Sequence, residues 1–84
     1  MIKIQEVTSQ GCRVCHMAKQ ILEEIKPRFT NVEIEYIDML TDQGQELVGK
    51  FGIMSAPGII INNELFCMGG LDKTKLIEKI KLLS

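Results

Sequence analysis

The sequence of 84 residues lacks several features that define large classes of proteins. No apolar run is long enough to span a bilayer, and the first residues, MIKIQEV, contain no apolar core of the kind found in secretory signals. The net charge of -1 gives no general reason to expect a nucleic acid or an anionic membrane as a partner. Linkers, repeats and low-complexity segments are also absent. We therefore expect one small domain over residues 1–84 that works as a monomer in the cytoplasm.

Cysteine is scarce, and this limits what the cysteines can do. The sequence contains three, so any pairing leaves one over and a structural disulfide framework is not expected. In a reducing cytoplasm, a spaced pair such as Cys12 and Cys15 is more often catalytic or metal-binding. The stretch GCRVCHMAK, residues 11–19, fits haem attachment through C-x-x-C-H, half a zinc site, a copper-carrier loop or a redox pair.

Alternating apolar and polar residues predict the strands. Residues 2–7 form the first, and residues 32–38, with Val32, Ile34 and Tyr36 on one face, form the second. A hairpin is expected from the apolar runs 59–61 and 65–68, because the polar pair Asn62-Asn63 separates them.

Helical spacing of apolar residues predicts three helices. The first runs from Cys12 to near Pro27, the second starts at Thr41 or Asp42 and ends at Gly52, and Asp72 caps the third. Their inner faces are expected to comprise Val14, Ala18, Ile21, Leu22 and Ile25 in the first, Leu47, Val48 and Phe51 in the second, and Leu76, Ile77, Ile80 and Leu83 in the third. The order β-α-β-α-β-β-α predicts an α/β fold with a four-stranded mixed sheet flanked by three helices.

The position of the cysteine pair favours redox chemistry. Cys12 stands where a loop enters a helix, and the free N–H groups and the helix dipole there stabilise a thiolate and lower a thiol pKa. The thiolate is the attacking species in disulfide exchange, so Cys12 is the candidate nucleophile. Cys15 lies one helical turn further on the same side of the helix and can resolve a mixed disulfide formed at Cys12.

Three stretches of the chain, together with its closing helix, resemble the thioredoxin/glutaredoxin superfamily, most closely its small, glutaredoxin-sized redox-active disulfide proteins. They are TSQGCRVC (8–15), YIDML (36–40) and KFGIMSAPGIIINNELFCMGG (50–70). The resemblance implies a thioredoxin-like fold and a thiol-disulfide oxidoreductase that acts on protein disulfides. It also implies a cis peptide bond at Pro57 and pairing of an extended substrate with the backbone of Ala56. Gly11 and Ser55 are expected to complete the substrate-binding surface.

The resemblance also leaves two electron donors open. No cofactor is expected to be bound, and electrons would come from a thioredoxin-reductase-type flavoprotein or from glutathione. Gly69, Gly70 and Asp72 resemble the glutaredoxin segment that holds the γ-glutamyl carboxylate of glutathione. However, glutaredoxins have Thr-Val-Pro where this chain has Ser-Ala-Pro, and a basic residue near position 10, which here is Gln10. A glutathione-linked protein therefore stands as the alternative.

Metal and haem sites are less well supported by the pattern. Zinc needs four ligands and only Cys67 remains, copper carriers end in a strand, and haem attachment requires export and a second axial ligand. We therefore expect no metal, His16 as a surface residue beside the pair, and Cys67 as a small buried hydrophobe. A non-catalytic module that binds a metal or senses redox state through Cys12 and Cys15 remains the hypothesis from a different class.

Overall fold

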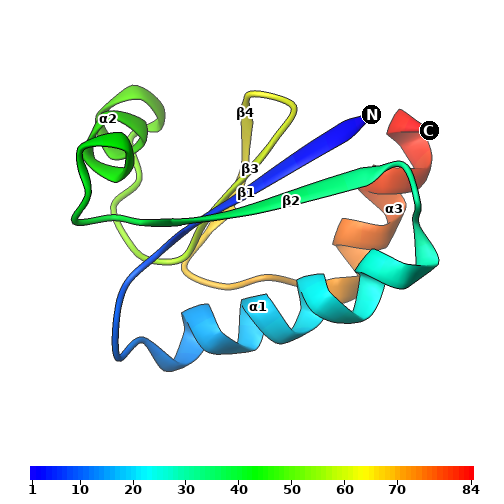
Figure 1. Cartoon of the computed structure of the whole chain (residues 1–84), viewed down its shortest axis with the longest axis horizontal. Helices are drawn as coiled ribbons and strands as arrows, with labels where there is room; N and C mark the ends of the chain where they lie inside the picture. Colours follow the sequence, from blue (N-terminus) through cyan, green and yellow to red (C-terminus); the bar gives the residue numbers. More distant parts are fainter.

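The computed structural model describes residues 1–84 and shows the expected order of elements (Figure 1). The strands and helices are β1 (Ile2–Thr8), α1 (Arg13–Ile25), the 3-10 turn η1 (Lys26–Arg28), β2 (Val32–Asp38), α2 (Asp42–Phe51), β3 (Gly58–Ile61), β4 (Glu64–Met68) and α3 (Lys73–Leu83). The predicted four-stranded sheet with three helices is confirmed. No helix combines the length and the apolar character needed to cross a membrane.

The sheet has the strand order β2-β1-β3-β4 and is mixed. β1 and β2 are parallel, with Glu6 opposite Tyr36, whereas β3 is antiparallel to both β1 and β4. The turn between β3 and β4 places Asn62 at φ 49° and Asn63 at φ 65°. Two consecutive left-handed residues are what a tight hairpin turn with the right twist requires, and asparagine tolerates this conformation well.

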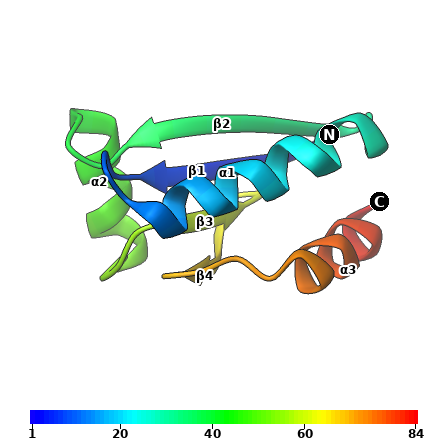
Figure 2. The ribbon, with the colours of Figure 1, turned by 90° about the horizontal axis from the view of Figure 1, so that it is seen from below.

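The two faces of the sheet carry separate cores. On one face, α1 and α3 cover Ile4, Ile59 and Ile61, which are all 2% exposed or less. On the other face, α2 covers Val7, Ile53 and Ile60. Figures 1 and 2 show this arrangement, with α2 on the opposite side of the sheet from α1 and α3. On β1, Ile2, Ile4 and Glu6 are buried on one face, whereas on the other Lys3 is exposed, Gln5 is half-buried and only Val7 is buried; this alternation specifies the register of the strand.

Capping residues define the helix ends. The Thr41 hydroxyl accepts a hydrogen bond from the Gly44 N–H at 3.1 Å, so Thr41 and not Asp42 caps α2. Asp72 caps α3 as expected, and Gly52 ends α2 with φ 65°, where glycine is favoured. α1 ends at Ile25, and Pro27 lies in the following 3-10 turn.

The prediction that Val14 and Leu83 lie in the core is wrong. Val14 and Leu83 are each 39% exposed. The inner face of α1 is centred on Cys15 and Ala18, which are 2% and 1% exposed, and this rotation turns Val14 to the side. Leu83 is the last residue of α3, where part of its side chain has no packing partner.

Candidate active site

Three loops meet at one edge of the sheet. Val7, near the carboxyl end of β1, pairs with Gly58 at the start of β3, so the loop that carries Cys12 lies beside the segment that contains Pro57. The Gly69 N–H donates a hydrogen bond to the Pro57 carbonyl oxygen at 2.9 Å, which attaches the segment after β4 to the same edge. Pro57 is buried, and the Ala56–Pro57 peptide bond is cis, as the resemblance implied.

The cysteine pair stands at the start of α1. Cys12 is the N-cap residue and Cys15 lies in the first turn; their sulfur atoms form a disulfide, with the Cα atoms 5.2 Å apart. Gly11 has φ 72°, a backbone conformation that residues other than glycine rarely adopt, and it turns the chain into the helix. Cys15 is only 2% exposed, whereas Cys12 is partly exposed. Of the two cysteines, Cys12 is therefore the one that an incoming reagent can approach more readily.

The helix terminus provides a donor for the Cys12 sulfur. The Cys15 N–H donates a hydrogen bond to Cys12 Sγ at 3.1 Å. This N–H is one of the first-turn donors that have no acceptor within the helix. The position favours negative charge on Cys12 Sγ, because the helix dipole and the N–H act in the same direction.

The sequence analysis missed Glu6, which lies beneath the pair. Its side chain is fully buried, and neither carboxylate oxygen has a hydrogen-bond partner. Burial raises the pKa of Glu6 from 4.5 to about 7. The Thr8 hydroxyl, which is near the carboxyl but outside hydrogen-bond geometry, and the positive charge of Lys19 oppose part of the rise. Continued alternation from Ile2 and Ile4 places residue 6 on the same inward face, and this pattern could have revealed it.

A cavity of about 240 Å³ joins Glu6 to the cysteines. Its lining includes Glu6, Thr8, Ser9, Gly11, Cys12, Cys15, His16, Lys19 and Tyr36. The Lys19 ammonium lies 5.2 Å from the centre of the Tyr36 ring, and the Tyr36 hydroxyl donates to Glu23 Oε2 at 2.6 Å. Burial and the bond to Glu23 raise the pKa of Tyr36, so it remains a neutral phenol. One carboxyl group and one ammonium thus lie close to the redox pair.

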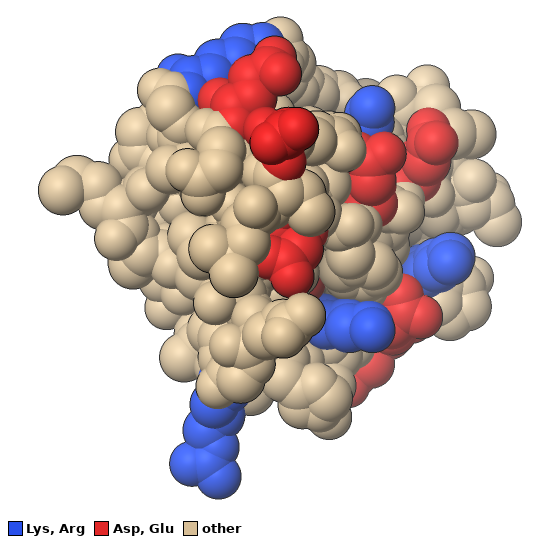
Figure 3. Space-filling view, turned by 60° about the vertical axis from the view of Figure 1, so that its left-hand side comes forward, with Lys and Arg blue, Asp and Glu red and all other residues tan.

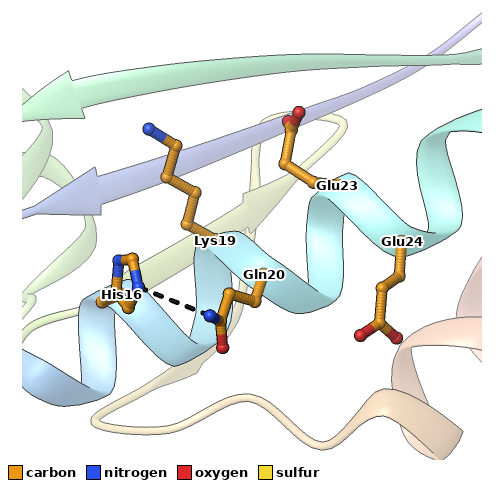
Figure 4. Close-up of a pocket in the computed structure, with 5 residues that line it drawn as sticks. All are labelled: His16, Lys19, Gln20, Glu23 and Glu24. Atoms are coloured by element: carbon orange, nitrogen blue, oxygen red, sulfur yellow. Dashed lines mark hydrogen bonds between the residues drawn. The ribbon is translucent and has the colours of Figure 1, made fainter.

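A larger hollow, of about 530 Å³, lies on the outer face of α1 (Figure 4). Its five lining residues all come from this helix: His16, Lys19, Gln20, Glu23 and Glu24. His16 is exposed, as expected, and its Nε2 lies 3.4 Å from Nε2 of Gln20. Glu24 forms an ion pair with Lys73 of α3 at 2.7 Å. No apolar side chain lines this open surface, so it is a polar helix face and not an enclosed pocket.

The remaining predicted residues have ordinary structural environments. Cys67 is half-buried in β4, and burial raises the pKa of its thiol, which reduces its reactivity. The carboxylate of Asp72 accepts a hydrogen bond from the Lys75 N–H at 3.1 Å as the cap of α3. Gly69 has φ 82° and lies close to the Ser55 hydroxyl. No group of three or more His, Cys, Asp or Glu side chains could hold a metal ion.

A cysteine pair at a helix start, beside a cis proline on a four-stranded sheet, defines a thiol-disulfide oxidoreductase of the thioredoxin fold. The chain belongs to the Thioredoxin domain family, whose model matches residues 2–81. It is 35% identical over 81 residues to a thioredoxin of Methanocaldococcus jannaschii, covering 95% of this chain and 93% of the relative. A probable thioredoxin of Methanothermobacter marburgensis is 31% identical with the same coverage. The chain therefore exchanges its Cys12–Cys15 dithiol and disulfide with disulfides of proteins.

Solved structures share the fold at low sequence identity. Fasciola hepatica thioredoxin is 21% identical, with a TM-score of 0.77 over 99% of this chain and 81% of that chain. Oxidised thioredoxin O2 of Arabidopsis thaliana is 15% identical, also with a TM-score of 0.77, over 99% of this chain and 75% of that chain. Both structures are evidence for the fold of the whole chain.

Proposed function

We propose that Cys12 is the attacking cysteine and Cys15 the resolving one. In the reduced protein, the Cys12 thiolate attacks one sulfur of a substrate disulfide, forms a mixed disulfide and releases the other sulfur as a thiolate. Cys15 then attacks Cys12 Sγ, which forms the Cys12–Cys15 disulfide and releases the second substrate thiol. The different exposure of the two residues carries this assignment, because Cys12 is partly exposed and Cys15 is 2% exposed.

The second step requires a proton acceptor, and Glu6 fits this role. Cys15 is a nucleophile only as a thiolate, so its thiol must lose a proton inside the protein. Glu6 lines the same cavity, and its pKa of about 7 lets it be ionised or protonated near neutral pH. The polar lining and volume of about 240 Å³ leave room for water to relay the proton between the two groups.

The substrate chain lies along the segment before β3. The backbone N–H and C=O of Ala56 make no hydrogen bond within the chain, which supports their pairing with an extended substrate segment. Pro57 fixes the direction of this segment beside the disulfide. Gly11 and Ser55, both exposed at the same edge, complete the surface that contacts the residues next to the substrate cysteine.

The electron donor is a thioredoxin-reductase-type flavoprotein, and the chain works in the cytoplasm as a monomer of one domain, residues 1–84. The names of the relatives, thioredoxin and probable thioredoxin, support this donor over glutathione. The alternative donor site at Gly69, Gly70 and Asp72 has less support, because the Asp72 carboxylate already caps α3. No cofactor is needed within the chain, since the two cysteines carry both electrons.

Three measurements test the proposal. Cys12→Ser abolishes the reduction of insulin disulfides, whereas Cys15→Ser still attacks them and accumulates a mixed disulfide that mass spectrometry detects. Unchanged insulin reduction by Cys12→Ser contradicts the assignment. Coupling the reaction to NADPH, through either thioredoxin reductase or glutathione with glutathione reductase, identifies the donor. Stoichiometric zinc or copper in the purified, reduced protein would instead favour a non-catalytic metal-binding module.

A further inference from the structure

The Lys19 ammonium, whose charge lowers the pKa of Glu6, is held by an aromatic ring and not by a carboxylate. Lys19 is exposed, and Figure 3 shows basic and acidic side chains close to one another over part of the surface. An exposed ammonium in such surroundings is attracted to nearby carboxylates. However, the one ion pair of the structure joins Glu24 and Lys73. The Lys19 ammonium instead lies 5.2 Å from the centre of the Tyr36 ring.

The carboxylate best placed to compete for Lys19 belongs to Glu23. It comes four residues after Lys19 on α1, and lysine and glutamate at this spacing attract each other. In Figure 4 both side chains extend from the helix toward the strands of the sheet. The Glu23 carboxylate nevertheless accepts a hydrogen bond from the Tyr36 hydroxyl at 2.6 Å. Tyr36 thus contacts both side chains, and they form no ion pair with each other.

The register of the sheet places Tyr36 beside Glu6. The pairing of β1 with β2 sets the two residues directly opposite each other, so their side chains leave the sheet on the same face. Both line the cavity of about 240 Å³ that contains the cysteine pair, and Lys19 lines it as well. A ring in this position brings the ammonium that it holds to the cavity of Glu6.

Among the groups around Glu6, Lys19 supplies the opposing charge. The titratable groups that line the cavity with Glu6 are Tyr36 from β2 and four from α1, namely Cys12, Cys15, His16 and Lys19. The β3 strand, Gly58–Ile61, carries no charge, and the inward residues of α3 are apolar. Asp38, at the end of β2, is outside this lining, and its carboxylate accepts a hydrogen bond from the Leu40 N–H at 2.9 Å. Of all these groups, Lys19 is the one whose charge lowers the pKa of Glu6.

We propose that Tyr36 is a positioning residue that keeps the Lys19 ammonium directed toward Glu6. Its ring binds the ammonium, and its hydroxyl binds the Glu23 carboxylate that would otherwise compete for it. The effect on catalysis rests on the proposed function, in which Glu6 accepts the proton of Cys15. Because the ammonium stabilises the ionised carboxyl group, this arrangement keeps a larger fraction of Glu6 available as a base near neutral pH.

Removal of the Tyr36 hydroxyl tests the proposal. Tyr36→Phe keeps the ring and the burial of Glu6, but it frees the Glu23 carboxylate to pair with Lys19. We expect the pKa of Glu6 to rise by about 1, as for the loss of one nearby opposite charge. Carboxyl ¹³C chemical shifts of the disulfide form measure this pKa, because neither cysteine titrates in that form. The pH profile of insulin reduction is expected to move to higher pH by the same amount.

Second substitutions identify the groups that cause the change. Tyr36→Phe/Glu23→Gln contains no competing carboxylate, so the pKa of Glu6 is expected to return to the wild-type value. Tyr36→Phe/Glu24→Gln is the matched control, because Glu24 is the next residue of α1 and its carboxylate pairs with α3 instead. In this control the pKa of Glu6 stays raised. In a Lys19→Met background, Tyr36→Phe produces no further change in that pKa.

The outcomes separate this proposal from the exchange mechanism. If Tyr36→Phe leaves the pKa of Glu6 unchanged, or if Glu23→Gln does not restore it, the positioning role is wrong and the exchange mechanism is untouched. A further rise of this pKa in the Lys19→Met background also contradicts the positioning role. If the pKa changes as expected while the pH profile of insulin reduction stays in place, the positioning role holds. The proposed proton transfer from Cys15 to Glu6 is then wrong.

Discussion

At the scale of single residues, Glu6 dominates the energetics of the site. Its carboxyl is buried without a hydrogen-bond partner, and its pKa rises to about 7. The folded protein therefore holds this proton up to about pH 7, whereas the unfolded chain releases it near pH 4.5. Between these values the folded state binds more protons, so the free energy of unfolding falls as the pH rises.

We predict that Glu6→Gln abolishes this decrease in the free energy of unfolding with rising pH. At about 1.4 kcal/mol per pKa unit, the wild type loses about 3 kcal/mol of stability from Glu6 between pH 4.5 and pH 8, because ionisation requires a buried charge. Urea denaturation at pH 5 and pH 8 measures the loss in both proteins. An equal pH dependence in the wild type and in Glu6→Gln contradicts the prediction. The proposed role of Glu6 as proton acceptor for Cys15 would account for an acid kept at this buried position despite the cost.

Lys19 is the positive charge that acts on Glu6. Its ammonium lowers the pKa of Glu6, so Lys19→Met raises this pKa further. We expect the pH profile of insulin reduction to shift toward higher pH, since the base must be ionised to accept the Cys15 proton. Lys19→Arg keeps the wild-type profile, and Lys26→Met, beyond the end of α1, serves as the charge control. An unchanged pH profile of insulin reduction in Lys19→Met would rule out the electrostatic effect of Lys19 on Glu6.

At the scale of elements, α2 packs so closely on the end of β2 that one position admits only glycine. A Cβ atom built on Gly44 would overlap the carbonyl oxygen of Asp38 and lie 2.6 Å from Cα of Met39. Both are backbone atoms, so the clash cannot be relieved by a side-chain rotation. The start of α2 is therefore fixed by this contact and by the Thr41 cap.

Two glycines of α2 make a matched pair of tests. Gly44→Ala is expected to destabilise the protein by about 2–4 kcal/mol, because the backbone must move to make room. Gly49→Ala, on the exposed face with no atom within 4 Å of the added Cβ, is expected to stabilise it by about 0.5–1 kcal/mol. Thermal and urea unfolding of both variants give the values. Similar effects of the two substitutions would refute the close contact.

The elements were predictable from the sequence because their patterns are local. Alternating apolar and polar residues predicted the strands, and capping residues such as Asp72 predicted the helix starts. The face that each residue presents was less predictable. Val14 fits the apolar stripe of α1 by spacing, yet only the docking of α1 decides that Cys15 points inward. Glu6 continues the inward alternation of Ile2 and Ile4, but a charged residue is ordinarily assigned to the surface, so the acid of the site was missed.

At the scale of the whole molecule, the redox pair lies at the margin of the packed cores: Cys15 is buried at the start of α1 but belongs to neither cluster of core residues. The core between α1, α3 and the sheet, and the core beneath α2, both lack the cysteines of the pair. The pair closes a loop with a sequence separation of only 3, at one edge of the sheet. Opening the disulfide therefore removes a local constraint and leaves the packing of both cores in place.

We predict that the reduced protein stays folded and loses only about 2 kcal/mol of stability, the chain-entropy estimate for so short a loop. Urea unfolding with and without dithiothreitol measures the loss, and amide chemical shifts show where the structure responds. Shift changes should be confined to residues 6–19, 53–58 and 68–72 and to Tyr36, which lie at or beside the site. Loss of cooperative unfolding, or changes throughout α2 and α3, would show that the disulfide holds the fold together. The protein cycles between the dithiol and the disulfide, so we expect the local response, in which the fold is the same in both redox states.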